Sequence, residues 1–138
     1  MKNKTILLNV KAVEIISSCE PEDFSYVTVE YVARRLGVSL PFLSRTFKKI
    51  FGMTLRDFLI LKKMLSALYL INKKPAILVK ELAAALAYDS TSQFIAAFKK
   101  LIGCTPKKML KRPEVRWLLC KQLKSTLKKY RKFNRNFL

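Results

Sequence analysis

The sequence predicts an all-α protein in which two helix-turn-helix subdomains are joined by a long connector helix and followed by a basic C-terminal helical tail. Three observations predict this fold. Apolar residues recur at helical spacing, with almost no alternating strand pattern. Only 3 of the 138 residues are glycine. One pattern of residues also occurs twice along the chain. We divide the chain into residues 1–54, 55–72, 73–110 and 111–138.

The repeated pattern is a set of five residues found at a constant offset. The first copy holds Phe47, Lys48, Lys49, Gly52 and Thr54, and the second holds Phe98, Lys99, Lys100, Gly103 and Thr105. Upstream, Val32-Ala33 with Gly37 matches Leu82-Ala83 with Ala87. Two copies are too few for a solenoid, which needs at least about three repeats. The repeat therefore indicates two equivalent modules in one small protein.

The first unit is predicted to hold three helices. An apolar stripe that includes Val10, Val13 and Ile16 predicts an amphipathic first helix, which Glu20-Pro21 ends. Thr28 is suited to cap a short helix over residues 29–36, which Gly37 ends.

The next two helices have clear start and stop residues. Ser39 is suited to cap a helix over 40–51 that buries Leu43 and Phe47, and Gly52 ends it in a left-handed conformation. Thr54 opens the connector over 55–72, which is apolar on too many sides for a surface helix and is expected to lie between two bodies. Its apolar residues are Leu55, Phe58, Leu59, Leu61, Met64, Leu65, Leu68, Tyr69 and Ile71.

The second unit repeats this plan after a turn at Lys73-Lys74-Pro75. A short helix is predicted over 79–86, and Ser90 is suited to cap the following helix. That helix is expected to bury four residues and to end at Gly103. The four are Phe94, Phe98, Leu101 and Ile102. Thr105-Pro106 then predicts another helix start.

The tail, residues 111–138, carries an apolar stripe and a basic stripe. The apolar residues are Trp117, Leu119, Leu123, Leu127 and Tyr130, and the basic ones are Lys121, Lys124, Lys128, Lys132 and Arg135. Three interpretations remain open, in order of preference: additional DNA binding, an amphipathic helix on a membrane surface, or a solvated face.

Charge indicates a polyanionic partner. The chain has 28 Lys and Arg against 9 Asp and Glu, a net charge of +19 that opposes compaction. Nucleic acid is the first candidate, and an anionic membrane surface is the second. Apolar runs are too short for a membrane span.

Composition argues against an enzyme and against a metal site. The chain has no histidine and no glycine-rich loop that could bind a phosphate. It also lacks a pair of acidic residues in similar sequence surroundings that could converge as a catalytic acid and base. Its 3 cysteines are odd in number and lack C-x-x-C spacing, so we expect no zinc, no cofactor, no disulfide framework and a reducing cytoplasmic location.

In a helix-turn-helix unit the second helix enters the major groove of DNA. With Leu43 and Phe47 inward, Arg45 is the best base reader of the first unit, because its guanidinium can bind both guanine acceptors. Lys48 and Lys49 suit phosphate, as do Lys99 and Lys100 in the second unit. Gln93 is the one long polar side chain there that suits adenine. We expect both helices on one face, about 34 Å apart, the rise of one DNA turn.

The motif residues resemble those of the AraC/XylS family of bacterial transcription regulators, over residues 28–110. The matching residues are Val32-Ala33, Gly37-Val38-Ser39, Leu43-Ser44-Arg45, Phe47-Lys48-Lys49, Phe51-Gly52, Ala67, Glu81-Leu82-Ala83, Phe94, Ala97-Phe98-Lys99-Lys100, Gly103 and Thr105-Pro106. The resemblance implies two recognition helices in successive major grooves of an asymmetric site. By position it places base contacts at Pro41, Ser44, Arg45, Ser92, Gln93 and Ala96. Phosphate contacts are expected at Ser39, Lys48, Lys49, Thr91, Lys99 and Lys100.

The chain also departs from the family pattern. Ala96 stands where the family commonly has arginine, and Ala87-Tyr88 replaces Gly-Phe. An alanine cannot hydrogen-bond to a base edge, so the second unit is expected to contribute mainly phosphate contacts and orientation. Lys63 replaces the usual connector arginine. The residues before Thr28 leave no room for a sensor domain, so a short, stand-alone, monomeric member is expected.

Three functions remain open from the sequence. The leading one is sequence-directed binding to double-stranded DNA in the cytoplasm, at the nucleoid, with regulation of transcription through RNA polymerase. The second keeps the fold but makes the protein a low-specificity DNA-coating protein or an antagonist of a relative. The third is a basic protein of a membrane surface or the ribosome that acts through its tail.

Overall fold

The structure is a computed structural model that describes residues 3–112, 114, 121 and 125. Of the predicted tail, Lys121 is helical and exposed. The tail's apolar stripe and its other basic positions lie outside the described residues. They are Trp117, Leu119, Leu123, Leu127, Tyr130, Lys124, Lys128, Lys132 and Arg135.

All secondary structure in the described residues is helical, which confirms the predicted fold class. In chain order the elements are α1 (Asn3–Ser17), the 3₁₀ helix η1 (Pro21–Ser25), α2 (Val29–Arg35), α3 (Leu40–Phe51), α4 (Leu55–Lys73), α5 (Val79–Ala85), α6 (Thr91–Ile102) and α7 (Pro106–Lys111). The predicted ranges 29–36, 40–51 and 55–72 differ from α2, α3 and α4 by at most one residue at an end.

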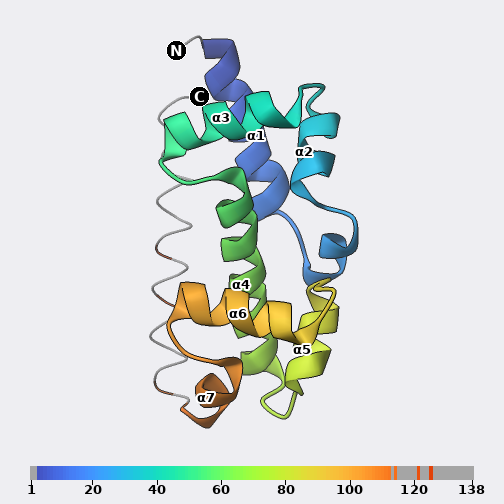
Figure 1. The fold of residues 1–138 in the computed structure, drawn as a ribbon, viewed down its shortest axis with the longest axis vertical. Helices are drawn as coiled ribbons and strands as arrows, with labels where there is room; N and C mark the ends of the chain where they lie inside the picture. The colour runs from blue at the N-terminus through green and yellow to red at the C-terminus, as the bar shows by residue number, and fades with distance from the viewer. Residues whose placement is uncertain (1–2, 113, 115–120, 122–124, 126–138) are drawn as a thin grey trace.

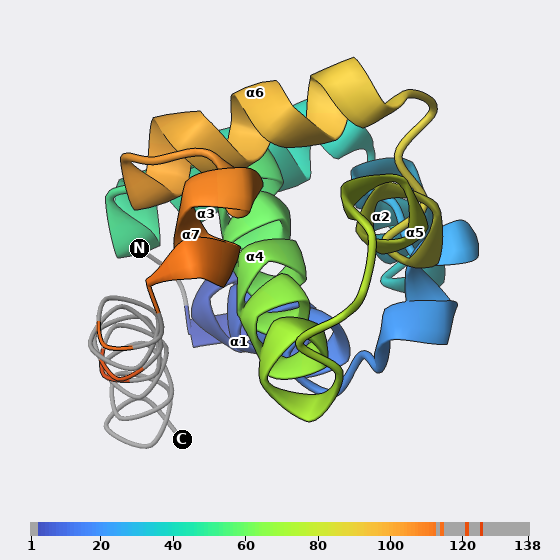
Figure 2. The same cartoon turned by 90° about the horizontal axis from the view of Figure 1, so that it is seen from below.

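The helices are arranged around α4, which runs along the long axis of the molecule (Figure 1). Helix α3 lies at the N-terminal end of α4, and α6 crosses its C-terminal half. Seen from below, α1 lies on the side of α4 away from α6 and also packs against α3, while α2 and α5 lie on a third side, at opposite ends of the long axis (Figures 1 and 2). Both helix pairs therefore share α4 as their common support.

Five helices begin at the hydroxyl residues that the sequence indicated. In each case the side-chain oxygen of the capping residue accepts a hydrogen bond from the backbone N–H three residues later, at 3.0–3.3 Å. The pairs are Thr28 with Tyr31, Ser39 with Phe42, Thr54 with Asp57, Ser90 with Gln93, and Thr105 with Lys108. Each bond satisfies a donor that has no partner within its helix. These local bonds fix where α3 and α6 start.

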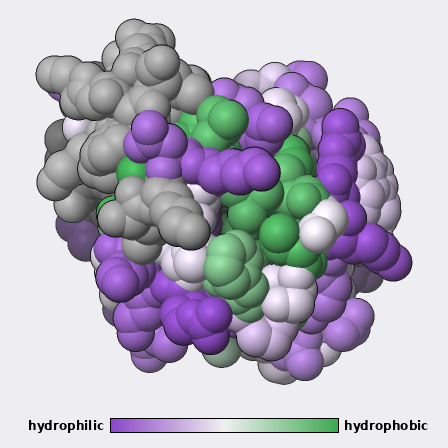
Figure 3. Space-filling view, turned by 90° about the horizontal axis from the view of Figure 1, so that it is seen from above, coloured by the Kyte–Doolittle hydropathy of each residue, from purple (hydrophilic) through white to green (hydrophobic). Residues whose placement is uncertain are grey.

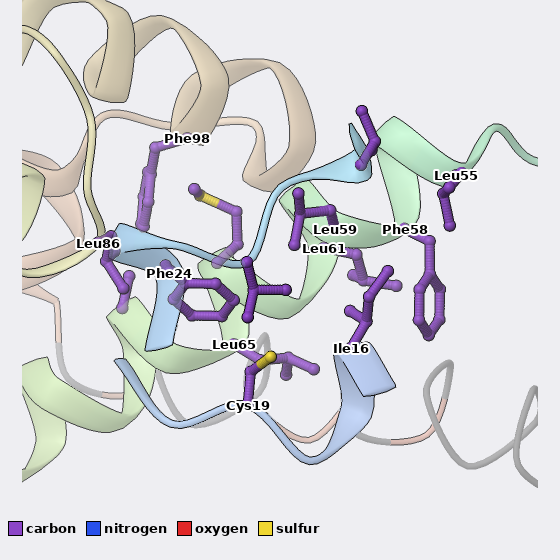
Figure 4. Close-up of a cluster of buried hydrophobic side chains, with 14 of the residues drawn as sticks. Ile16, Cys19, Phe24, Leu55, Phe58, Leu59, Leu61, Leu65, Leu86 and Phe98 are labelled. Atoms are coloured by element: carbon purple, nitrogen blue, oxygen red, sulfur yellow. The ribbon is translucent and has the colours of Figure 1, made fainter. Parts of the chain in front are cut away.

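Helix α4 is the centre of one hydrophobic core that includes side chains from α1 to α7. Figure 4 shows part of this cluster, with Leu59, Leu61 and Leu65 of α4 between Ile16 of the first unit and Leu86 and Phe98 of the second. The α4 residues that are buried are Leu55, Phe58, Leu59, Leu61, Met64, Leu65, Ser66, Ala67, Leu68 and Ile71. The two helix-turn-helix units are therefore not independent domains.

Two residues that we expected in the core lie at the surface. Tyr69 of α4 is 55% exposed and Leu101 of α6 is 39% exposed. Each occupies a side of its helix that none of the helices α1 to α7 covers, so apolarity alone overestimated the width of the buried face. The Lys73 amine lies 5.8 Å from the Tyr69 ring centroid and shields part of it.

Apolar side chains also gather at the end of the molecule formed by α1 and α3, where hydrophilic residues border them (Figure 3). Leu7 of α1, 40% exposed, is one of the large apolar side chains that reach the surface. Among the described helices, none combines the length and the apolarity that a membrane span requires.

The turns that precede the two recognition helices have the same hydrogen bonds but different residues. In the first, the Val38 N–H donates to Ala33 O at 3.1 Å, and Gly37 has φ +73°. In the second, the Tyr88 N–H donates to Ala83 O at 3.0 Å, and Ala87 has φ +62°. Both are Schellman motifs, in which glycine is preferred because a Cβ atom opposes the left-handed conformation. The second turn therefore keeps the geometry of the first at a cost in strain.

Ala87→Gly is expected to raise the free energy of unfolding by about 0.5–1 kcal/mol. Relief of left-handed strain of about 1–2 kcal/mol exceeds the entropy gained by the unfolded chain, about 0.4–1 kcal/mol. Urea unfolding followed by circular dichroism measures the change.

The matched control is Gly37→Ala, which should lower the free energy of unfolding by a similar amount. A Cβ atom at Gly37 meets no atom within 4 Å, so the loss reports backbone conformation alone. Equal stability of Ala87→Gly and the original chain would show that the turn is not strained.

Candidate nucleic-acid interface

The two predicted recognition helices lie on the same face of the molecule. Figures 1 and 2 both show α3 and α6 on one side of α4, with similar directions and with their N-termini toward α2 and α5. Neither helix contains an acidic residue. Helix α4, with 19 residues at about 1.5 Å each, is about 28 Å long and separates them. The expected 34 Å separation stays a prediction.

On α3, the predicted contact residues occupy the exposed side opposite the core. Leu43 and Phe47 are fully buried, as predicted, and this places Pro41 and Arg45 at the surface. The guanidinium carbon of Arg45 lies 6.0 Å from the centroid of the Phe42 ring. This contact supports the stem of Arg45 while its donors remain open to a ligand.

Of the remaining α3 candidates, Ser39 lies at the N-terminal end, the lysine pair lies at the C-terminal end, and Ser44 lies between them. Ser39 is exposed, but its hydroxyl already accepts a hydrogen bond from the Phe42 N–H at 3.3 Å, and so it acts as a cap. Lys48 and Lys49 are exposed in the last turn. We expected Ser44 to face outward, but it is half-buried, because it lies beside the inward residue Leu43.

On α6, burial of Phe94 and Phe98 leaves the predicted contact residues on the outer side. Ser92, Gln93, Ala96, Lys99 and Lys100 are all exposed. Thr91, the first residue of the helix, is half-buried and so is less accessible than we expected.

The repeat register shows how the two helices differ. Relative to the caps Ser39 and Ser90, Arg45 of α3 corresponds to Ala96 of α6, and Ser44 corresponds to Ile95. The terminal lysine pairs are retained in both helices. The two surfaces therefore share phosphate-binding chemistry but differ in the groups that can hydrogen-bond to a base.

Two exposed cations that the sequence analysis did not propose occupy matching positions after the recognition helices. Arg56 is the second residue of α4, and Lys107 is the second residue of α7. Both follow a hydroxyl cap that comes shortly after the glycine ending α3 or α6. The sequence contained this pair, because continuing the repeat two residues beyond Thr54 and Thr105 matches Arg56 with Lys107.

Helix α1 supports α3 from behind through a buried polar contact. The Asn9 Nδ2 atom donates to the Thr46 hydroxyl at 3.0 Å and to the Thr5 carbonyl oxygen at 2.9 Å. Thr46 in turn donates to the carbonyl oxygen of Phe42 at 3.0 Å. Both side chains are buried. This contact ties the first recognition helix to a helix far from it in sequence.

The described residues offer little for metal or thiol chemistry. Among them, no three His, Cys, Asp or Glu side chains lie close enough together to hold a metal ion. Cys19 is buried, burial raises the pKa of its thiol, and its Sγ atom donates to the Ile15 carbonyl oxygen at 3.2 Å. Such a thiol is a weak nucleophile.

Comparisons with known proteins agree with this geometry. Residues 32–112 match a family model described as a helix-turn-helix domain. The chain is similar to a solved structure, the C-terminal domain of AraT, a response regulator from Geobacillus stearothermophilus. The identity is 29%, the match covers 75% of this chain and 84% of that domain, and the TM-score is 0.66. No curated protein matches the chain. The family match begins within α2, so α1 and η1 precede it.

Thr46→Val is expected to lower the free energy of unfolding by about 1–3 kcal/mol, because it leaves a buried N–H of Asn9 without an acceptor. The measurement is urea unfolding of the purified variant.

Ser18→Ala serves as the control, because the exposed Ser18 hydroxyl donates only to the Ile15 carbonyl oxygen. Its effect should stay within about 0.5 kcal/mol. If both variants lost the same stability, the contact between α1 and α3 would not be the cause.

Proposed function

Because this chain belongs to the AraC-type helix-turn-helix family and is a DNA-binding transcription regulator, we propose that it binds a specific asymmetric DNA site through α3 and α6 in successive major grooves. The observation that carries the proposal is that both cationic recognition helices lie on one face and run in similar directions (Figure 2). Proteins of this family are typically not enzymes.

We assign different roles to the two recognition helices. Arg45 reads guanine in the first half-site, since its exposed guanidinium can donate to O6 and N7 together. Pro41 offers an apolar contact for a thymine methyl group, and the half-buried Ser44 contributes at most one hydroxyl contact. In the second half-site, Gln93 suits adenine, whereas Ser92 and Ala96 offer only small surfaces.

Phosphate contacts position both helices on the duplex. The exposed pairs Lys48-Lys49 and Lys99-Lys100 supply most of the charge at the C-terminal ends of α3 and α6, and we propose further contacts at the N-terminal ends from the cap Ser39 and from Thr91, the first residue of α6. We add Arg56 and Lys107, which occupy equivalent positions after each recognition helix. With ~6–10 phosphates neutralised, affinity should fall about 10³–10⁵-fold between ~50 and ~200 mM salt.

Further features of the proposal follow from the same geometry. We propose that the protein binds as a monomer, because the chain itself carries two reading helices. We also propose that it acts in the cytoplasm, at the nucleoid, and that it regulates transcription by contacting RNA polymerase. The division into residues 1–54, 55–72, 73–110 and 111–138 describes its first unit, connector, second unit and basic tail.

A second function is favoured by one observation, the exposed Ala96 at the position equivalent to Arg45. A recognition helix without a strong hydrogen-bonding residue holds DNA with little sequence discrimination. The alternative is therefore a low-specificity protein that coats DNA or blocks the site of a relative.

Arg45→Ala separates the two functions. In a specific regulator it should weaken binding to a selected duplex by about 1–3 kcal/mol, roughly 5–150-fold, because a bidentate base contact is lost. Binding to a scrambled duplex should barely change. Fluorescence anisotropy with both duplexes, after selection from random DNA, measures this difference.

Lys48→Ala is the matched control on the same helix. It should weaken binding to both duplexes equally and reduce the salt slope by about one unit. If the original chain bound selected and scrambled duplexes equally at moderate salt, the protein would be a coating protein.

Deletion of the residues after Leu110 tests the interpretation that function lies in the basic tail. The described reading helices remain, so selective DNA binding should be retained, with a smaller salt slope. Loss of selectivity on deletion, with α1 to α7 still folded by circular dichroism, would make the tail the principal functional element. Binding to anionic vesicles and ribosomes provides the parallel measurement.

A further inference from the structure

The amine of Lys63 in α4 lies close to two aromatic rings, one from the N-terminal part of the chain and one from the second helix-turn-helix unit. It is 4.7 Å from the ring centroid of Tyr88 and 5.7 Å from that of Phe24. Phe24 belongs to η1, which precedes the first helix-turn-helix, and Tyr88 lies in the turn between α5 and α6. Both distances are within the range in which a cation attracts a ring face.

The fold brings these three elements together. Figures 1 and 2 both place η1 next to α5 and the turn that follows it, although η1 belongs to the other half of the chain. Figure 4 shows Phe24 near Leu86, the C-cap residue of α5, and both side chains belong to the buried cluster. This junction joins the two units beside the connector.

The Lys63 amine is partly removed from water at this junction. Burial lowers its pKa, and the nearby carboxylate of Asp89 opposes that effect. A desolvated cation gains more from an aromatic ring than an exposed one, because water competes less. The contact with Tyr88 and Phe24 is therefore stronger than a surface contact of the same length.

The contacts of Tyr88 are made by its ring rather than by its hydroxyl group. Its hydroxyl oxygen is buried and has no hydrogen-bond partner in the described part of the chain. Burial raises its pKa to about 12, so the ring is neutral at physiological pH. The ring lies 5.5 Å from that of Phe94, a fully buried residue of α6. A contact on Tyr88 therefore acts on α6 directly.

Tyr88 is also close to the start of α6 in the chain. It immediately precedes Asp89 and the cap residue Ser90, and its N–H closes the Schellman motif that ends α5. Phe24, on the other side of Lys63, is itself buried and fixed in the core. Lys63 thus connects the buried Phe24 ring of the first unit to the turn that precedes α6, the second recognition helix.

We propose that Lys63 is a positioning residue that holds the second helix-turn-helix unit at a fixed orientation to the first and so restricts the half-site spacing that the protein accepts. This inference rests on the proposed binding of α3 and α6 to successive grooves. Lys63 itself does not contact DNA in this proposal.

The test uses the full chain and a DNA site selected from random duplexes, with one base pair inserted or removed between the half-sites. One base pair rotates the second half-site by about 34–36°. The original chain should bind the altered spacings at least about 10-fold more weakly than the selected one. Lys63→Met, which keeps an unbranched apolar side chain, should reduce this penalty to below about 3-fold. Lys63→Arg, which keeps the cation, should restore it.

The matched control is Lys73→Met. Lys73 is also in α4 and lies 5.8 Å from the ring centroid of Tyr69, but that pair is within one helix and does not join the two units. It should retain the full spacing penalty. If Lys63→Met also retained the penalty, the Lys63 side chain would only fill space in the core, and the inference would be wrong.

A DNA-free measurement separates this inference from the proposed function. Residual dipolar couplings of the free protein should fit one orientation of α2–α3 relative to α5–α6, and in Lys63→Met the two helix pairs should no longer fit one orientation. If the original chain showed no spacing preference while these couplings changed as expected, the two-groove function would fail and the positioning role would stand. Unchanged couplings would overturn the role.

Phe24→Leu is the second variant, for use if Lys63→Met does not fold. It keeps an apolar side chain in the core but removes the ring on the first-unit side of Lys63. The same reduced spacing penalty and altered couplings are expected. A folded Phe24→Leu protein that behaved as the original chain in both measurements would refute the proposal.

Discussion

The burial of α4 is the constraint on which the rest of the structure depends. This helix presents apolar side chains on several sides, and neither helix-turn-helix unit could cover all of them alone. Each fully buried leucine contributes roughly 1.5–3 kcal/mol through removal from water. The units therefore fold against a shared core, and α4 supports both recognition helices. Their common direction is a consequence of this shared burial.

Within that core, short-range bonds fix where each recognition helix begins. Hydroxyl caps start α3 and α6, and Schellman turns aim the chain into them. The second turn achieves the same geometry with Ala87 in a left-handed conformation. The two units thus have the same local shape but different exposed residues on their recognition helices, with Arg45 in one and Ala96 in the other.

The equal shape and the different exposed residues of the two units bear on how the protein is proposed to bind DNA. In the proposed function, the lysine pairs give both helices a similar attraction to phosphate, while base discrimination is assigned mainly to α3. If α6 mainly contacts the phosphate backbone of DNA, it contributes to selective binding only when its position relative to α3 is fixed. The junction of Phe24, Lys63 and Tyr88 supplies such a link, because it crosses from one unit to the other.

The sequence by itself determined the fold class, the start of five helices and the three glycine stops. These features depend on bonds within about four residues, so a local pattern contains them. Only the tertiary structure decided which side of a helix is covered. Tyr69 and Leu101 are exposed, Ser44 and Thr91 are half-buried, and Asn9 meets Thr46, because these outcomes depend on neighbours from distant parts of the chain. The orientation of α3 relative to α6 belongs to the same class, since packing on both sides of α4 sets it.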